Sequence, residues 1–292
     1  MRVVFHADDF GLTRAVNAGI VEACERGLLR STSLMVTATA ADEAAAAART
    51  LPALDVGLHV TLVEERPVLP PDRIPTLVDE DRFWPDHSAV FARYVTNRWS
   101  LAEAEAEVAA QFGRLAALGL RPSHCDGHQH LHLLPRLFPA VVELARSHGA
   151  QFVRSQLGGP VGGEGSLGRR LSQLALRGIS RFARKRLAPT AREETGSCIT
   201  IGFLEAGGRL TTTRLLAMLD EIRARGSDGV VVEVMLHPGH RDRETERRYG
   251  HWNYAWERDL ALLVDPALPD ALARRGIEVT SFRALAAERG RR

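Results

Sequence analysis

Residues 2–11 read RVVFHADDFG, an apolar run that leads into two adjacent carboxylates, Asp8 and Asp9, and then a glycine. A short apolar run of this kind predicts a buried strand over 3–7, with both carboxylates directly after it. Because neighbouring residues of an extended chain point in opposite directions, one carboxylate can bind a cation while the other stays available as a base. The alternative is that the pair caps the helix expected to begin near Thr13, but Thr13 is itself the better cap.

Further along the chain, short β-rich runs alternate with longer helical patterns. Strands are expected at 3–7, 32–36, 56–61, 123–126, 151–154, 199–203, 230–236 and 277–281. Helices are expected at 15–26, 42–50, 101–117, 137–147, 212–225 and 258–274, several of them closed by glycine. Segments 64–98 and 156–166 are expected to be loops over one barrel mouth. The alternation predicts βαβ units, and a chain of 292 residues is long enough for one α/β barrel.

Polar residues gather at the carboxyl ends of the expected strands. In a (β/α) barrel these ends converge on one face, which is where active sites lie. The residues concerned are Asp8, Asp9, His59, Asp126, His128, Arg154 and His237. We therefore expect them to share one site.

Residues 124–132 read HCDGHQHLH and contain four of the eleven histidines. If this segment is a strand end, alternation places His128, His130 and His132 on one face. Histidine is a frequent metal ligand, so the cluster predicts a metal-dependent active site. The alternatives are a hydrogen-bonded strand edge and a surface tract, and for His132 alone a structural role is as good an explanation as a functional one.

Composition indicates a cytoplasmic enzyme. The net charge of +2 is too small to require a nucleic-acid partner, and no basic face follows the whole chain. The three cysteines are few and unpatterned, which is typical of a reducing compartment. We expect no leader peptide, because the chain enters a strand at once, and no transmembrane run.

Taken together, four motifs resemble those of the YdjC-like carbohydrate deacetylases. They are Ala7-Asp8-Asp9-Phe10-Gly11-Leu12, Gly57-Leu58-His59, the histidine-rich run 124–132, and Glu233-Val234-Met235-x-His237-Pro238. Residues 251–252 and 262–266 further resemble the subgroup associated with hopanoid biosynthesis. The family fold that this resemblance implies is an irregular (β/α) barrel similar to that of polysaccharide deacetylases, here as a single domain over 1–292.

The resemblance also implies roles for individual residues. Asp9, His59 and His128 would be the metal ligands, Asp8 the catalytic base and His237 the acid. Contacts to the substrate or to the ligands would come from His124, Asp126, His130, His132, Arg154 and Glu233, with Asp126 well placed to orient a metal-bound imidazole. Gln129 stands where relatives often carry histidine, which puts a proton relay through that position in doubt. The cofactor would be one divalent metal ion, Mg²⁺ or Zn²⁺ or another transition metal.

The implied reaction removes an N-acetyl group from an N-acetylated sugar or glycolipid, such as an N-acetylglucosaminyl hopanoid, and yields acetate and a free amine. Two alternatives stay open. One is another metal-dependent hydrolase such as a phosphoesterase, which would normally need two metals or a phosphate clamp. The other is a non-catalytic glycolipid-binding barrel, against which the presence of both a base and an acid candidate argues. A homodimer also stays open.

A basic segment at 167–188 interrupts the barrel pattern. It contains seven arginine or lysine residues and no acidic residue, and helical spacing predicts an amphipathic helix. Such a helix can lie on an anionic membrane surface, which would make the protein peripheral to the inner membrane face. The alternative is a solvated excursion whose apolar stripe packs on the barrel.

Overall fold

The computed structural model describes residues 1–158, 167–189, 191, 198–225 and 229–290. The main strands are β1 (Arg2–Phe10), β2 (Ser31–Leu34), β3 (Asp55–Val60), β6 (His124–Gly127), β7 (Phe152–Val153), β8 (Cys198–Ile201), β9 (Val231–Leu236) and β10 (Glu278–Val279). A small hairpin is formed by β4 (Val78–Asp79) and β5 (Arg82–Phe83).

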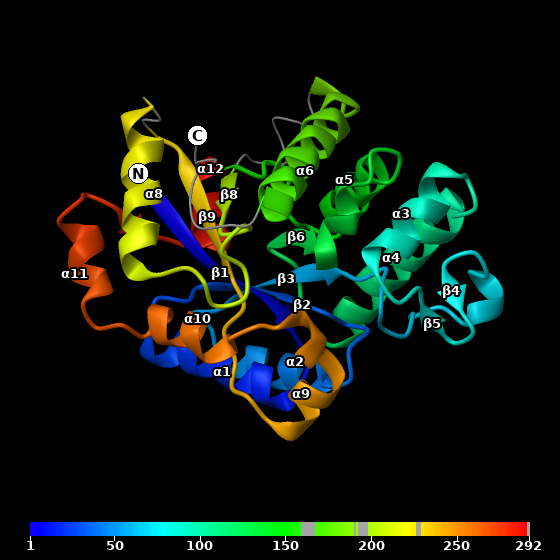
Figure 1. Cartoon of the computed structure of the whole chain (residues 1–292), viewed down its shortest axis with the longest axis horizontal. Helices are drawn as coiled ribbons and strands as arrows, with labels where there is room; N and C mark the ends of the chain where they lie inside the picture. Colours follow the sequence, from blue (N-terminus) through cyan, green and yellow to red (C-terminus); the bar gives the residue numbers. More distant parts are fainter. Residues whose placement is uncertain (159–166, 190, 192–197, 226–228, 291–292) are drawn as a thin grey trace.

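The helices are α1 (Arg14–Arg26), α2 (Ala41–Thr50), α3 (His87–Val95), α4 (Leu101–Ala117), α5 (Phe138–Ser147), α6 (Leu167–Lys185), α8 (Thr212–Ala224), α9 (Arg243–Tyr249), α10 (Trp256–Leu263), α11 (Leu268–Ala273) and α12 (Phe282–Arg289). Short 3₁₀ helices are η1 (Pro71–Arg73), η2 (His128–Leu133) and η3 (Gly250–Trp252). The α-helices are distributed around the sheet (Figure 1).

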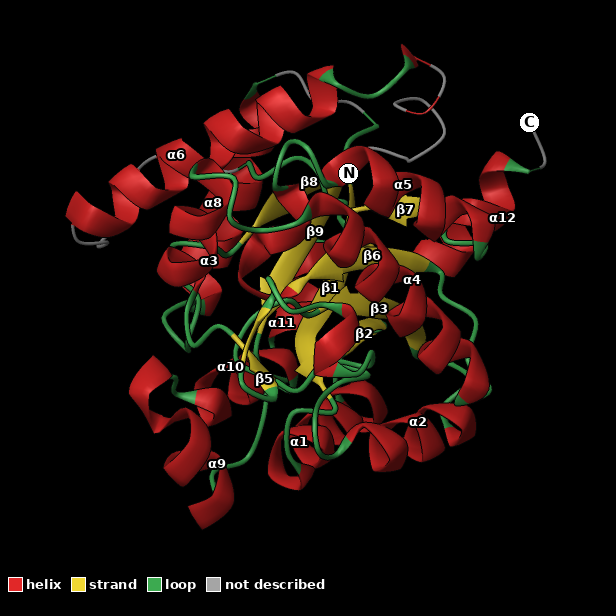
Figure 2. Ribbon diagram, turned by 90° about the vertical axis from the view of Figure 1, so that its right-hand side faces the viewer, coloured by secondary structure: helices red, strands yellow, loops and turns green. Residues whose placement is uncertain are grey.

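One parallel sheet forms the centre of the molecule, with helices around it (Figure 2). Its strand order is β7-β6-β3-β2-β1-β9-β8, and β10 pairs with the start of β1. The two edges approach one another, since Leu157, beyond β7, forms a parallel bridge to Thr200 of β8. A curled parallel sheet whose edges meet by a single bridge is an irregular (β/α) barrel, as the sequence predicts.

Sequence patterns explain most helix ends. The Thr13 side chain caps α1 by accepting from the Val16 N–H, as expected. At the other end of helices, Gly119 and Gly149 follow α4 and α5 with φ of 77° and 92°, a conformation that favours glycine. All eight expected strands are present within a few residues of their predicted bounds.

Three local predictions are wrong. The helix expected at 258–274 is two helices, α10 and α11, because Pro266 disfavours the helical conformation of the residue before it. Segment 64–98 is not only loop, since it contains the β4–β5 hairpin and α3. Finally, β1 continues to Phe10, so that Asp8 and Asp9 lie inside the strand and not after it.

Most of the loop expected at 156–166 lies outside the described residues. Within the described part of the chain, no helix has both the length and the apolar character needed to cross a bilayer.

Candidate metal centre and active site

The end of β1 supplies both carboxylates through an irregularity in the sheet. The pairing of β1 with β2 shifts between Ala7 and Phe10, and Asp9 has a positive φ of 65°. An irregularity of this kind re-aims side chains at the end of a strand. As a result, Asp8 and Asp9 face different partners although they are neighbours in the chain.

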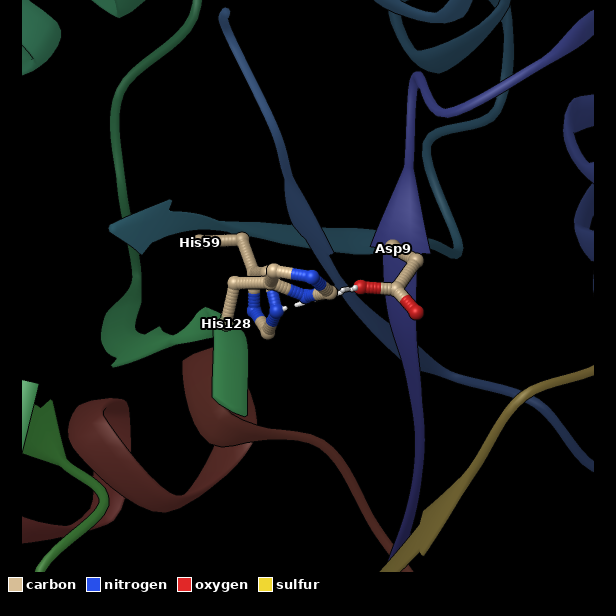
Figure 3. A group of neighbouring side chains, drawn as sticks. All are labelled: Asp9, His59 and His128. Atoms are coloured by element: carbon tan, nitrogen blue, oxygen red, sulfur yellow. Dashed lines mark hydrogen bonds and ion pairs between the residues drawn. The ribbon is translucent and has the colours of Figure 1, made fainter. Parts of the chain in front are cut away.

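Asp9, His59 and His128 form a buried cluster at the carboxyl ends of β1, β3 and β6. The Asp9 Oδ1 atom lies 3.0 Å from His128 Nδ1 and 3.3 Å from His59 Nε2. Both imidazole rings face the same carboxylate (Figure 3). One donor atom from each residue lies within 4.8 Å of the others, as a shared cation requires.

In each imidazole, the ring nitrogen that does not face Asp9 contacts a second carboxylate. His59 Nδ1 lies 2.8 Å from Asp126 Oδ1, and the Ser33 hydroxyl donates to the other oxygen of Asp126 at 3.1 Å. His128 Nε2 lies 3.5 Å from Glu64 Oε2. Carboxylates in these positions set the tautomer and the orientation of a metal-binding imidazole.

The electrostatics of the cluster favour a cation. Burial lowers the pKa of His59, but Asp126 and Asp9 outweigh it and raise the pKa to about 10. Burial likewise opposes protonation of His128, and Asp9 and Glu64 raise its pKa to about 9. The same field that holds protons on these imidazoles would hold a divalent cation in their place. The donor set of one carboxylate and two imidazoles suits zinc and other transition metals.

Asp8 is held apart from this cluster by Arg154. The guanidinium binds Asp8 through two hydrogen bonds, NH1 to Oδ2 at 2.8 Å and NH2 to Oδ1 at 2.7 Å. Burial raises the pKa of Asp8, but the charge of Arg154 outweighs this effect and holds the pKa well below its usual range. Asp8 is therefore ionised at neutral pH.

Arg154 also binds two further carboxylates. Its NH2 atom lies 2.8 Å from Asp126 Oδ2 and 2.8 Å from Glu233 Oε1, and the Thr200 hydroxyl donates to Glu233 at 2.6 Å. From the sequence, Arg154 and Glu233 were expected to contact the substrate or the ligands. In the structure Glu233 binds Arg154, and Arg154 binds both Asp8 and Asp126, the carboxylate that contacts His59.

A second group of possible ligands, His6, Asp8 and Asp126, lies beside the first. Its carboxylates already share the Arg154 guanidinium, which balances their charge. This arrangement favours one metal site over two bridged ones.

His237 follows β9 and reaches the same site. Its Nε2 lies 3.9 Å from Asp9 Oδ2, its ring packs on Tyr254, and its backbone N–H donates to Asp259. Its Nδ1 atom is buried and has no hydrogen-bond partner among the described residues. An unpartnered polar atom beside the cluster is available to a ligand.

The remaining histidines are placed differently from one another. His124 lies under the site, where its ring meets His6 and Phe282. His132 Nε2 contacts the Arg154 carbonyl at 3.0 Å, and His130 packs against Phe203. Burial lowers the pKa of His130 to about 3 and that of His132 to about 4, so both are neutral.

The expected alternation of His128, His130 and His132 along a strand is wrong. The strand β6 ends at Gly127, and the histidines lie in η2, where Gln129 and His130 have positive φ of 49° and 58°. The turn sends His128 towards Asp9, while the Gln129 side chain reaches the exposed His87 instead.

Two residues of the site, His6 and Glu64, were not predicted from the sequence. His6 Nε2 lies 3.1 Å from Asp126 and 3.3 Å from Asp8, and these hydrogen bonds outweigh burial and raise its pKa to about 9. In the sequence, the feature that could have indicated His6 is its position as a polar residue inside an apolar strand. Glu64, besides contacting His128, accepts from Trp252 Nε1 at 3.3 Å. In the sequence, only the position of Glu64, five residues after His59, could have indicated that Glu64 belongs to the site.

Comparison with known proteins identifies the same family that the sequence motifs resemble. The model of the family described as "YdjC-like protein" matches residues 2–274. A carbohydrate deacetylase of Geobacillus stearothermophilus is 31% identical, with 96% of each chain covered. A chitooligosaccharide deacetylase of Enterobacter sp. (strain 638) is also 31% identical, over 96% of this chain and 97% of the relative.

The fold has a solved counterpart. A crystal structure from Enterococcus faecalis V583, described as that of a putative cellobiose-phosphate cleavage protein, superposes with a TM-score of 0.74 at 27% identity. The match covers 97% of this chain and 98% of that protein.

Proposed function

Because the chain belongs to the YdjC-like protein family, we propose that it is a metal-dependent carbohydrate deacetylase. It would hydrolyse the amide bond of an N-acetylated sugar or glycolipid to acetate and a free amine. The observation that carries this proposal is the separation of two neighbouring carboxylates: Asp9 joins two imidazoles, while Asp8 is held ionised by Arg154. The deacetylase names of the relatives support the same reaction.

One divalent cation would be held by Asp9, His59 and His128. When bound, it lowers the pKa of a water molecule and polarises a carbonyl oxygen. Zinc fits the imidazole donors well, and Mg²⁺ or another transition metal is the alternative. Asp126 and Glu64 would keep the two imidazoles oriented.

Asp8 would accept the proton of the attacking water. It is ionised at neutral pH and is held in place by both guanidinium nitrogens of Arg154. His237 would give a proton to the departing amine, since an unprotonated amine leaves poorly. Its buried position, with Nε2 3.9 Å from Asp9 Oδ2, supports this role.

Arg154 argues against the phosphoesterase alternative. A phosphate clamp needs a cation that faces the substrate, and this guanidinium is engaged by three buried carboxylates. The described residues around it therefore favour amide hydrolysis with a single metal.

For the substrate, we propose an N-acetylated sugar or a glycolipid that carries one. The resemblance to the subgroup associated with hopanoid biosynthesis makes an N-acetylglucosaminyl hopanoid the glycolipid to test first. We propose a cytoplasmic location, which the three free cysteines support.

A mass-spectrometric screen tests the proposal. The metal-loaded protein is incubated with N-acetylated sugars, chitooligosaccharides and glycolipids, and each is examined for the loss of one acetyl group with release of acetate. A chelator should abolish the reaction and added metal should restore it. His59→Ala should lose both metal and activity. A protein that binds metal tightly and deacetylates none of these compounds would favour the non-catalytic binding barrel.

A further inference from the structure

The basic segment at 167–188 forms a surface helix on which three large apolar side chains are exposed, while Leu176 and Ile179 pack on the barrel. It forms α6, which spans 19 residues, about 28 Å at the α-helical rise, and lies along the outer edge of the molecule (Figure 2). Leu171, Leu174 and Phe182 are 57%, 50% and 54% exposed. The alternative in which the apolar stripe packs on the barrel is therefore wrong for these three residues, although Ile179 does pack there.

The helix has three sides. Ser180 and Ala183 are buried against the barrel, and the Ser180 hydroxyl donates to the Ser155 carbonyl. Leu171, Leu174 and Phe182 share a second side, because residues spaced by three, four, seven or eight positions lie on one face. A third side, next to the exposed apolar one, carries the cations Arg170, Arg177, Arg181 and Arg184.

The cationic side is continuous with a basic groove. A cavity of about 530 Å³ lies between α6, β8 and α8. It is lined by Arg177, Arg181, Arg184, Lys185 and Arg225, and none of its described lining residues is acidic. Burial and the charges of Arg181 and Arg225 lower the pKa of Arg177. The positive charge is therefore concentrated enough for like charges to oppose one another.

We propose that α6 is a docking surface for an anionic lipid bilayer. A partner for this face must offer both negative charge and an apolar phase, directly beside one another. The boundary of a bilayer with anionic headgroups offers both along the whole length of a helix lying in its plane. A nucleic acid would match the cations but would leave Leu171, Leu174 and Phe182 exposed to water. The inference stands on α6 alone and does not depend on the proposed reaction.

Co-sedimentation with lipid vesicles tests the proposal. The full chain is mixed with phosphatidylcholine vesicles with and without phosphatidylglycerol, at low and at physiological salt. We expect binding only to the vesicles with phosphatidylglycerol, weakened by salt. Each cation near such a surface is worth about fivefold in partition. The triple variant Arg170→Glu, Arg181→Glu and Lys185→Glu should therefore bind at least tenfold more weakly. It uses exposed cations and spares Arg184, which donates to Ser155.

A second variant tests the apolar side. Leu171→Ser with Phe182→Ser should also weaken binding at least tenfold, and both residues are exposed enough to be replaced without loss of folding. The matched control is Phe91→Ser with Val95→Ser on α3, which removes similar exposed apolar area elsewhere. The matched charge control is Arg243→Glu, Arg247→Glu and Arg258→Glu, three exposed cations outside α6. Both controls should bind as the parent does.

Three results would overturn the proposal. They are no binding of the parent protein at low salt, equal loss in the controls, and a parent dimer that the Leu171→Ser, Phe182→Ser variant dissociates without any change in vesicle binding. The last would identify a second copy of the chain as the partner. Thermal unfolding of every variant shows whether it is folded, independently of deacetylase activity.

Discussion

Arg154 is the residue that holds Asp8, the proposed base, in place. Its side chain is buried and contacts Asp8, Asp126 and Glu233 within 2.8 Å. Removing one partner of a buried ionic network leaves an uncompensated charge, so these residues act as a unit. We propose that its role is to hold Asp8 ionised and oriented.

The first prediction concerns Asp8, the proposed base. Asp8→Asn should fold and bind metal, because the amide keeps the shape and Arg154 retains Asp126 and Glu233. It should lose about a hundred- to ten-thousand-fold in kcat, since a general base is removed. Metal content by calorimetry and acetate release measure the two effects. Nearly full activity at saturating metal would show that another group is the base.

The second prediction concerns Glu64. Its carboxylate lies behind His128, as that of Asp126 lies behind His59. Glu64→Gln should therefore weaken metal affinity by about 10- to 100-fold, because partners of metal-binding imidazoles contribute about this much. Titration of the metal-free protein with zinc measures it without reference to activity.

Glu80→Gln is the matched control for Glu64. Glu80 is exposed and has a positive φ of 59°, close to the 65° of Glu64. Both substitutions therefore place glutamine in a left-handed backbone conformation. The control should bind zinc as the parent does. If Glu64→Gln also does so, Glu64 does not orient His128.

At the scale of elements, α4 holds the chain segment that follows β3. Gln111 accepts from the Thr61 N–H at 3.0 Å and donates to the Thr61 carbonyl at 2.7 Å. Glu107 accepts from the N–H groups of Val68 and Leu69, both at 2.9 Å. Two buried side chains on one helix therefore fix both ends of the segment that carries Glu64.

The third prediction tests whether Glu107 holds this segment in place. Glu107→Ala should lower the free energy of unfolding by about 1–3 kcal/mol, because it leaves two backbone N–H groups without their acceptor. It should also weaken zinc binding through the displaced Glu64. Chemical denaturation and zinc titration measure the two effects. Glu105→Ala, on the same helix but partly exposed, should change stability by less than about 0.5 kcal/mol. Equal effects of both substitutions would contradict the proposal that Glu107 holds this segment in place.

At the scale of the whole molecule, the two ends of the chain meet beneath the site. β10 pairs with the start of β1, and Phe282 at the beginning of α12 packs against His6, His124 and Phe152. Residues far apart in sequence thus form one layer under the carboxylates of the candidate site. We propose on this ground that residues 1–292 are a single domain.

The fourth prediction follows from this packing. Phe282→Ala should lower the free energy of unfolding by about 3–5 kcal/mol, the range for a large buried aromatic residue. Phe91→Ala, with 46% of Phe91 exposed, should have little effect. Denaturant titration compares the two variants. A loss at Phe282 no larger than at Phe91 would mean that the C-terminal helix does not support the barrel.

The strands, most helices and the composition of the site follow from the sequence, because they depend on local patterns. The helix α4 has the predicted bounds, and Asp9, His59 and His128 come together as the motifs indicate. The carboxyl ends of parallel strands meet on one face whatever the details of packing, so polar residues at those ends were informative.

Only the tertiary structure decided how those residues are used. Three features depend on neighbours from other strands, and no local sequence pattern predicts them. They are the turn at Gln129 and His130, the positive φ of Asp9 and the position of Glu64. The sequence predicted that Arg154 contacts the substrate or the ligands, and only the structure shows that its partners come from three other strands. The outward apolar side of α6 was undecided for the same reason: periodicity shows that a helix has faces, and only packing shows which face meets the barrel.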